Sequence, residues 1–149
     1  MSKNVKLKRG LSINLLGEAD KVYSSVKSHK SFALKPTDFH NLTPKLSVKI
    51  GDKVKSGSVV FFDKYNDKIN FCSPVSGEVT DIVRGAKRKI LEVLINAEEE
   101  IKYVSFPVLK STDLSREQII DNMLKGGVWP FIRQKPYDII ANPTDMPKA

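Results

Sequence analysis

The sequence predicts a mainly β protein of the α+β class, in which a compact β domain is followed by the start of an α/β domain. Short runs of alternating apolar and polar residues, separated by glycine or proline, fill most of residues 1–106. This alternation is typical of half-buried strands. One capped helical pattern follows in residues 107–149. With 149 residues, of which 40% are hydrophobic and 28% charged, the composition is that of a globular protein rather than a disordered one.

The strands are expected to be short and regularly spaced, which favours a β-barrel or β-sandwich. They are predicted at 5–8, 11–15, 32–34, 45–50, 59–62, 69–71, 77–82 and 90–95, with a further short strand at 101–104. The polar segments 63–68 and 84–89 are predicted to be hairpin tips, and 98–100 a loop.

The helix is predicted from its start signal and its apolar face. Ser115 is a suitable N-cap, and Gln118 completes a capping box. Ile119, Ile120, Met123 and Leu124 recur at helical spacing. Gly126 is expected to take the left-handed position after the helix. A short helix in 127–133 and an extended approach at 137–140 would then lead into a Rossmann-like α/β unit, so we expect a domain that is cut before its next strand.

The net charge of +8 is concentrated at the amino-terminal end. Residues 1–60 contain 12 Lys or Arg and 4 Asp or Glu, whereas residues 61–149 contain 13 of each. Such a basic region suits lipid headgroups, an acidic protein face or nucleic acid. Nucleic acid is not expected as a partner, because aromatic residues do not alternate with the lysines as a stacking surface requires. The alternative is that the lysines protect strand edges from pairing with other chains.

The sequence argues against several chemistries. Cys72 is the single cysteine, and the two histidines are His29 and His40. An internal disulfide, a cysteine-rich zinc site and an iron–sulfur cluster are therefore not expected. We find no catalytic constellation and predict no catalytic or metal-binding residue. There is also no apolar run of 18 residues and no export signal, so a cytoplasmic protein is expected.

Two motifs indicate a specific β fold. Residues 51–57 have the form GDxVxxG. The second motif, SPVSGEV at residues 73–79, begins 16 residues after Gly57. The pair resembles the barrel-sandwich hybrid of biotinyl and lipoyl domains, which carry a cofactor on a lysine at a hairpin tip between these motifs. Lys64 follows Asp63 in that tip, so a lipoyl-type carrier is one functional alternative. The Met-Lys-Met of biotinyl domains is absent, and an ordinary solvated lysine is the other reading.

A longer series of motifs resembles one family. The flanks Lys35-Pro36, the turn Arg84-Gly85-Ala86-Lys87-Arg88, and the segment 126–136 (GGVWPFIRQKP) occur in the same order as in the A subunit of the bacterial sodium-translocating NADH:quinone oxidoreductase. That protein is related to the flavin subunit of respiratory complex I and to the C subunit of the Rnf complex. The match covers the amino-terminal part of a much longer chain.

The resemblance implies a peripheral, non-catalytic subunit on the cytoplasmic face of the bacterial inner membrane, soluble when isolated. The complex uses NADH, flavins, iron–sulfur centres and quinone, and couples electron transfer to sodium export. No cofactor is expected in this chain, because Val128, Trp129 and Pro130 replace most of a glycine-rich phosphate loop. The expected partners are the other subunits, especially the membrane-embedded B subunit, and an anionic lipid surface.

Three residues are candidates for contact with quinone. Trp129, Phe131 and Arg133 could supply flat apolar surface and one hydrogen-bond donor. The alternative is that Trp129 and Phe131 anchor the core between the two domains.

Overall fold

The computed structural model describes residues 16–25, 29–107 and 114–146. The strands predicted at 5–8 and 11–15 lie outside the described residues. The domain division at 106/107, which comes just before the undescribed stretch 108–113, remains a prediction.

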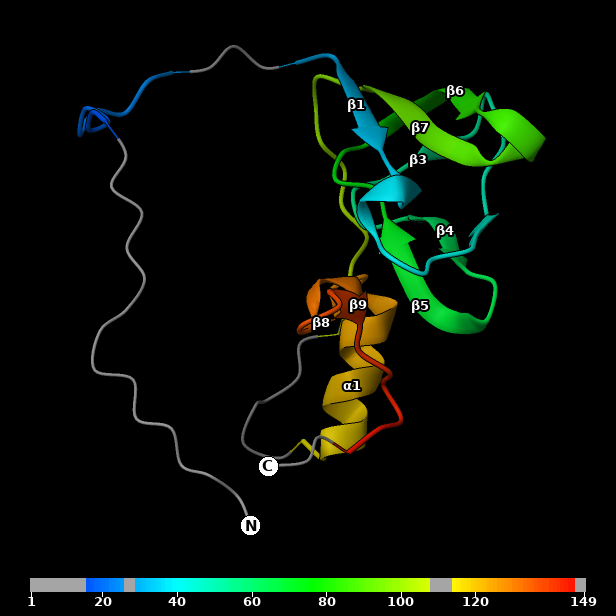
Figure 1. Cartoon of the computed structure of the whole chain (residues 1–149). Coiled ribbons are helices and arrows are strands. Elements are labelled where there is room, and N and C mark those ends of the chain that lie inside the picture. Colours follow the sequence, from blue (N-terminus) through cyan, green and yellow to red (C-terminus); the bar gives the residue numbers. More distant parts are fainter. Residues whose placement is uncertain (1–15, 26–28, 108–113, 147–149) are drawn as a thin grey trace.

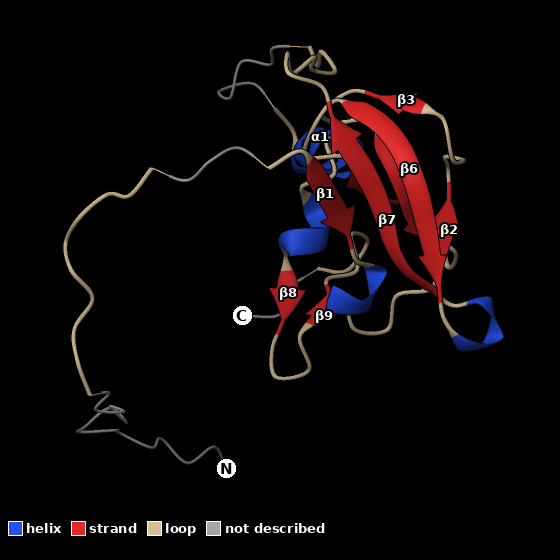
Figure 2. Cartoon of the chain, turned by 90° about the horizontal axis from the view of Figure 1, so that it is seen from above, coloured by secondary structure: helices blue, strands red, loops and turns tan. Residues whose placement is uncertain are grey.

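Two antiparallel sheets form the β domain (Figure 1). The first has the strand order β1-β7-β6-β3, with bounds Ser31–Leu34, Ile90–Ala97, Gly77–Arg84 and Lys53–Val54. The second has the order β2-β4-β5, with bounds Pro44–Leu46, Val59–Asp63 and Asn66–Cys72. Figure 2 shows the strands of the first sheet side by side. Their inward residues and those of the second sheet build a core of fully buried side chains: Val60, Phe61, Val79, Val93 and Ile95.

The two predicted motifs lie against each other, as expected for a barrel-sandwich hybrid. The Gly51 N–H donates to the Val79 carbonyl at 2.8 Å, and the Val79 N–H donates to the Asp52 carbonyl at 2.9 Å. The Gly57 N–H reaches the Ser73 carbonyl at 2.8 Å. Gly51 and Gly57 have φ of +90° and +95°, the left-handed region that glycine tolerates best. The Asp52 carboxylate accepts from the Lys49 N–H at 2.8 Å, so it stabilises its own turn.

The carboxy-terminal segment packs against β5 of the second sheet. It contains helix α1 (Arg116–Lys125), the 3-10 helix η4 (Trp129–Phe131) and the small hairpin β8 (Arg133–Gln134) and β9 (Ile139–Ile140). Ser115 and Gln118 form the predicted capping box. Buried side chains of this segment join the core of the barrel: Leu124, Trp129 and Ala141. None of the helices in the part of the chain that the structure describes has the length and apolar character needed to cross a membrane.

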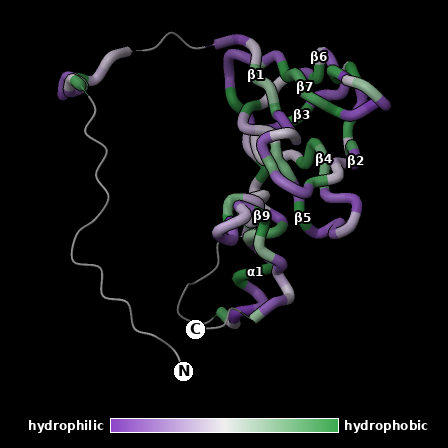
Figure 3. Tube along the Cα trace, viewed as in Figure 1, coloured by the Kyte–Doolittle hydropathy of each residue, from purple (hydrophilic) through white to green (hydrophobic). Residues whose placement is uncertain are grey.

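Several local predictions differ from the structure. The first hairpin tip is only Lys64-Tyr65, because β5 already starts at Asn66, and Figure 3 shows this turn as hydrophilic. The strand predicted at 45–50 ends at Leu46, since residues 49–52 form a turn and Ile50 is 60% exposed. The strand predicted at 101–104 is a single parallel bridge between Tyr103 and Ser56.

The helix end also differs from its prediction. Gly127, with φ +68°, takes the left-handed position, whereas Gly126 stays right-handed at φ −77°. The left-handed residue that follows the helix therefore comes one position later than the sequence predicts. The later turn carries Gly127 against Cys72, where a Cβ on residue 127 would lie 2.6 Å from the sulfur.

Candidate functional site

A groove of about 410 Å³ lies between the barrel and the carboxy-terminal segment. It is mostly apolar, with a few charged side chains at its edge. It is lined by Leu34, Lys35, Asp38, Phe39, Phe61, Phe71, Cys72, Pro74, Gly127, Phe131 and Arg133. Residues from the 3-10 helix η1 (Pro36–Asp38) and from β1, β4, β5 and η4 therefore meet here, although they are up to about a hundred residues apart in sequence.

Phenylalanine rings form the groove's wall. Phe61 and Phe71 stack with ring centroids 4.7 Å apart, and Phe39 meets Phe71 edge to face, also at 4.7 Å. Phe131 approaches Phe39 at 6.2 Å. Phe61 and Phe71 are buried, whereas Phe131 is 71% exposed. The groove's wall therefore combines two buried, stacked rings with one aromatic side chain, Phe131, that is largely exposed to solvent.

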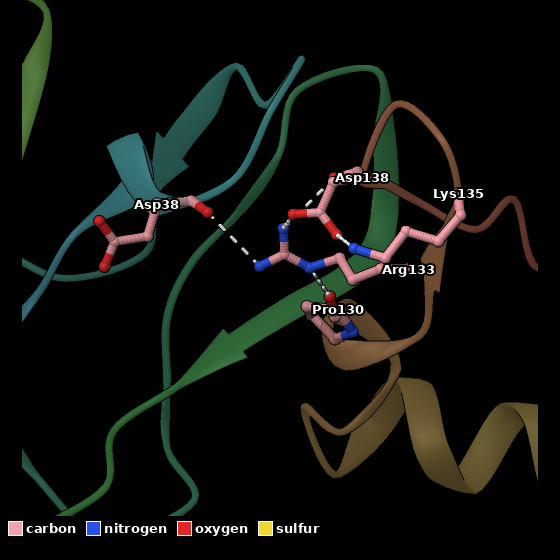
Figure 4. Close-up of polar contacts among 5 residues, drawn as sticks. All are labelled: Asp38, Pro130, Arg133, Lys135 and Asp138. Carbon is pink, nitrogen blue, oxygen red and sulfur yellow. Dashed lines mark hydrogen bonds and ion pairs between the residues drawn. The ribbon is translucent and has the colours of Figure 1, made fainter. Parts of the chain in front are cut away.

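Arg133 is the polar centre of this region (Figure 4). Its Nε donates to the Pro130 carbonyl at 3.2 Å, and its Nη1 pairs with the Asp138 carboxylate at 3.1 Å. Its Nη2 reaches the Asp38 carbonyl at 3.4 Å, a long contact. The guanidinium also stands over the Phe39 ring, 4.4 Å from the centroid. Arg133 thus connects the carboxy-terminal segment to the barrel, and the Nη2 group is the least firmly bound of its donors.

Asp138 is held by two cations. Lys135 donates to its carboxylate at 3.0 Å, and Arg133 binds the other oxygen. The hydrogen bond from Lys135, with charges from Lys135 and Arg133, lowers the pKa of Asp138 below its ordinary value. The carboxylate is therefore ionised at neutral pH and fixes the side chain of Arg133.

Trp129 does not line this groove. Its ring is buried at 7% exposure, and its indole N–H donates to the Ala141 carbonyl at 2.7 Å. This placement corresponds to the alternative of a core anchor. The structure thus brings Phe131 and Arg133 together at the groove and places Trp129 behind them.

Cys72 lines the groove beside Gly127 and is partly buried. Burial raises the pKa of its thiol, so the neutral form dominates at pH 7 and the nucleophilic thiolate is scarce. Among the described residues, no group of three or more His, Cys, Asp and Glu side chains could hold a metal ion. The groove is chemically suited to bind a flat apolar molecule with a polar end.

Phe39, Phe71, Lys35 and Asp38 line the groove, but the sequence does not mark them as site residues. Phe71 is expected from the pattern to be an ordinary inward strand residue. Phe39 lies in an irregular segment without periodicity, so its packing against Phe71 has no sequence signal. The flanking pair Pro36 and Pro44 indicates only that this segment is not a long strand or helix.

Comparison with known proteins identifies the family of the chain. The family model described as the NqrA N-terminal barrel-sandwich hybrid domain matches residues 5–98. The chain belongs to the NqrA family. A second model, described as the NqrA second alpha/beta domain, matches residues 114–149. The resemblance seen in the sequence and the predicted barrel-sandwich hybrid fold are both confirmed.

Similar NqrA proteins are named as the A subunit of the Na(+)-translocating NADH-quinone reductase. The protein from Pseudomonas aeruginosa is 33% identical over 147 residues, which cover 97% of this chain and 33% of that protein. The Marinomonas protein is 30% identical over 146 residues, with the same coverage. The Vibrio vulnificus protein is 33% identical over 135 residues, covering 89% of this chain and 30% of that protein. The chain thus spans about a third of the length of these NqrA relatives.

Proposed function

We propose that the chain is the amino-terminal, non-catalytic part of a peripheral subunit of a sodium-translocating NADH–quinone reductase. In this role it binds neighbouring subunits, above all the membrane-embedded B subunit, at the cytoplasmic face of the inner membrane. The observation that carries the proposal is the NqrA family membership, together with relatives named as the A subunit of that reductase. Electron transfer from NADH to quinone and sodium export belong to the whole complex.

The loop after α1 supports the view that the flavins are held by other subunits. A flavin phosphate at a glycine-rich loop requires backbone N–H groups that point outward. Here the N–H groups of residues 126, 127, 128, 131 and 132 all donate to carbonyls of residues 122–129. Pro130 has no N–H to offer.

Four described lysines of the basic amino-terminal region lie on edge strands or directly beside them. Lys45 is on β2 and Lys53 on β3, each at the edge of its sheet, and both side chains are exposed. Lys49 and Lys55 are exposed beside these strands. Edge protection and partner binding both explain this placement. Charge reversal distinguishes the two explanations. A carboxylate protects a strand edge as well as an ammonium does, so replacing lysine by glutamate should impair only partner binding.

The test is assembly of the complex with four lysines reversed. We expect the full-length protein with Lys45→Glu, Lys49→Glu, Lys53→Glu and Lys55→Glu to co-purify with the membrane subunits at less than about a tenth of the wild-type level, since each reversal turns attraction into repulsion. A matched control reverses four exposed lysines elsewhere: Lys64, Lys68, Lys102 and Lys125. Undiminished co-purification of the first variant would contradict the proposal.

A second role is proposed for the groove, namely contact with quinone. The flat apolar walls suit a quinone ring, and the weakly bound Nη2 of Arg133 could donate to a quinone carbonyl. A photoreactive quinone is expected to label residues 126–136 in the assembled complex, and Phe131→Ala to reduce the labelling several-fold. A probe that labels the complex but never this segment would exclude the role.

The lipoyl-type carrier stays an alternative. Lys64 lies at the two-residue tip between β4 and β5, and its Nζ stands 5.9 Å from the centroid of the Tyr65 ring. Intact mass after co-expression with a lipoate ligase distinguishes the two readings. An unmodified mass rejects the carrier, whereas an added lipoyl group that is absent from Lys64→Ala supports it.

A further inference from the structure

The turn between β6 and β7 carries a cluster of basic side chains that the proposed roles do not use. Figure 2 shows the turn as a short helical segment that projects beyond the end of β6. Its cations, all exposed, are Arg84, Lys87, Arg88 and Lys89. None of them forms an ion pair with any other residue that the structure describes.

The nearest carboxylates in sequence are already engaged. On β6, the Asp81 carboxylate accepts from the Ile82 N–H at 2.7 Å. On β7, Glu92 pairs with Lys35 at 3.2 Å. The four cations of the turn therefore have no carboxylate ion-pair partner among the described residues.

The backbone of the turn is strained at two of these cations. Lys87 and Arg88 have φ of +54° and +61°, a region that disfavours residues with a Cβ. The turn is closed by a hydrogen bond from the Gly85 N–H to the Lys89 carbonyl at 2.8 Å. Asn-Gly is the pair that suits consecutive left-handed residues in a hairpin. Strain of this kind, held by the surrounding structure, points to a function for the side chains.

A small polar pocket of about 210 Å³ lies beside the turn. Apolar residues, such as Leu42 and Ile90, form part of its lining. Its polar lining residues are Lys89 and, from the segment around and after η1, Thr37, His40 and Asn41. These are hydrogen-bond donors with one fixed positive charge, which suits an oxyanion. The pocket and the turn together form a basic surface with one recess.

We propose that this surface, which we call the 84–89 turn surface, binds an acidic segment of a protein partner, with one carboxylate in the recess at Lys89. A lipid surface fits less well, because the turn has no large apolar side chain to insert between headgroups: its uncharged residues are Gly85 and Ala86. A fixed turn with a recess also suits a directional carboxylate contact better than a fluid layer. The inference rests on the proposed function in one respect, that a component of an assembly has protein neighbours.

The first test titrates the full 149-residue chain with poly-L-glutamate at low salt and follows the amide signals of residues 84–89 by NMR. We expect Lys87→Glu with Arg88→Glu to weaken binding at least about tenfold. The matched control is Lys64→Glu with Lys68→Glu, which changes the net charge equally at the other hairpin, and it should weaken binding less than about threefold. Equal losses in both variants, or no binding by the wild-type chain, would overturn the proposal.

The second test uses the strain of the turn. Lys87→Asn with Arg88→Gly places residues that tolerate left-handed backbone, so the melting temperature should stay level or rise while affinity for poly-L-glutamate falls at least about fivefold. Unchanged affinity in this folded variant would refute the proposal.

A third test uses phosphatidylserine vesicles. If the wild-type chain binds these vesicles through the 84–89 turn surface but does not bind poly-L-glutamate, the surface is a lipid site and the proposal is refuted. None of these arms needs the other components of the reductase, so they can fail while the proposed function stands.

Discussion

At the scale of single residues, the need for glycine at position 77 comes from the close approach of two strand backbones. Gly77 is the first residue of β6. A Cβ at this position would lie 1.9 Å from the Asn96 carbonyl oxygen on β7. Backbone atoms of a paired strand cannot move aside as a side chain can. The glycine is therefore required by the packing of β6 on β7.

We predict that Gly77→Ala lowers the free energy of unfolding by about 2–4 kcal/mol, because the added methyl must separate two paired strands. Urea denaturation of the purified chain measures this. Gly85→Ala is the control, since its Cβ would meet only the end of the Leu91 side chain at 3.1 Å. A loss in Gly77→Ala no larger than in this control would show that the strands adjust freely.

At the scale of elements, local sequence signals determine where helix α1 starts, and long-range packing determines which of its apolar residues are buried. Helix α1 starts where its capping box predicts, because both hydrogen bonds of the box are local: Ser115 N–H to Gln118 Oε1 at 2.9 Å, and Gln118 N–H to Ser115 Oγ at 3.3 Å. Its apolar face is less uniform than expected. Leu124 is buried, Ile120 and Met123 are half-buried, and Ile119 is 43% exposed.

We predict that Ser115→Ala destabilises the chain by about 1 kcal/mol, since the first turn of α1 loses the acceptor for its Gln118 N–H. Ser115→Asp retains a side-chain acceptor and should stay within about half of that loss. Thermal unfolding followed by circular dichroism compares the three proteins. A Ser115→Asp protein as unstable as Ser115→Ala would mean that the hydroxyl acts in some other way than as a cap.

At the scale of the whole molecule, Arg133 holds the carboxy-terminal segment on the barrel. It joins Asp38 and Phe39 near the first sheet to Pro130 and Asp138 of the segment. Within the segment, the Asp138 carboxylate fixes the position of the guanidinium that makes this link. Since the folded-state pKa of Asp138 is lowered, its contribution to stability is complete above the ordinary aspartate value of about 3.9 and is lost as the pH falls through the lowered value.

We predict that Asp138→Asn lowers the melting temperature at pH 7 and loses less stability than wild type when the pH falls from about 5 to 3. Asparagine tolerates the left-handed backbone of this residue, which has φ +53°. The substitution therefore tests the charge and not the turn. Melting curves of both proteins across this range provide the measurement. If the melting temperatures of the two proteins fall equally between pH 5 and 3, the carboxylate of Asp138 has no role in stability.

The sequence by itself determined the features that depend on neighbouring residues. These are most of the period-two strands of the described chain, the capped helix and the family resemblance, which the structure or the comparisons confirm. The strands predicted at 45–50 and 101–104 are the exceptions, since the first ends at Leu46 and the second is a single bridge. Each structural feature is encoded within a few residues, where the pattern of side chains acts directly on the local backbone.

Only the tertiary structure decided which residues form the groove and which distant residues lie beside the 84–89 turn. Arg133 meets the Asp38 carbonyl across 95 residues, and Phe39 meets Phe71 although neither position carries a signal for the other. Trp129 and Phe131 are two residues apart, yet the η4 turn buries one and exposes the other. Such contacts arise because the two motifs and the carboxy-terminal segment bury a common core, and no local pattern specifies which polar side chains that packing brings together.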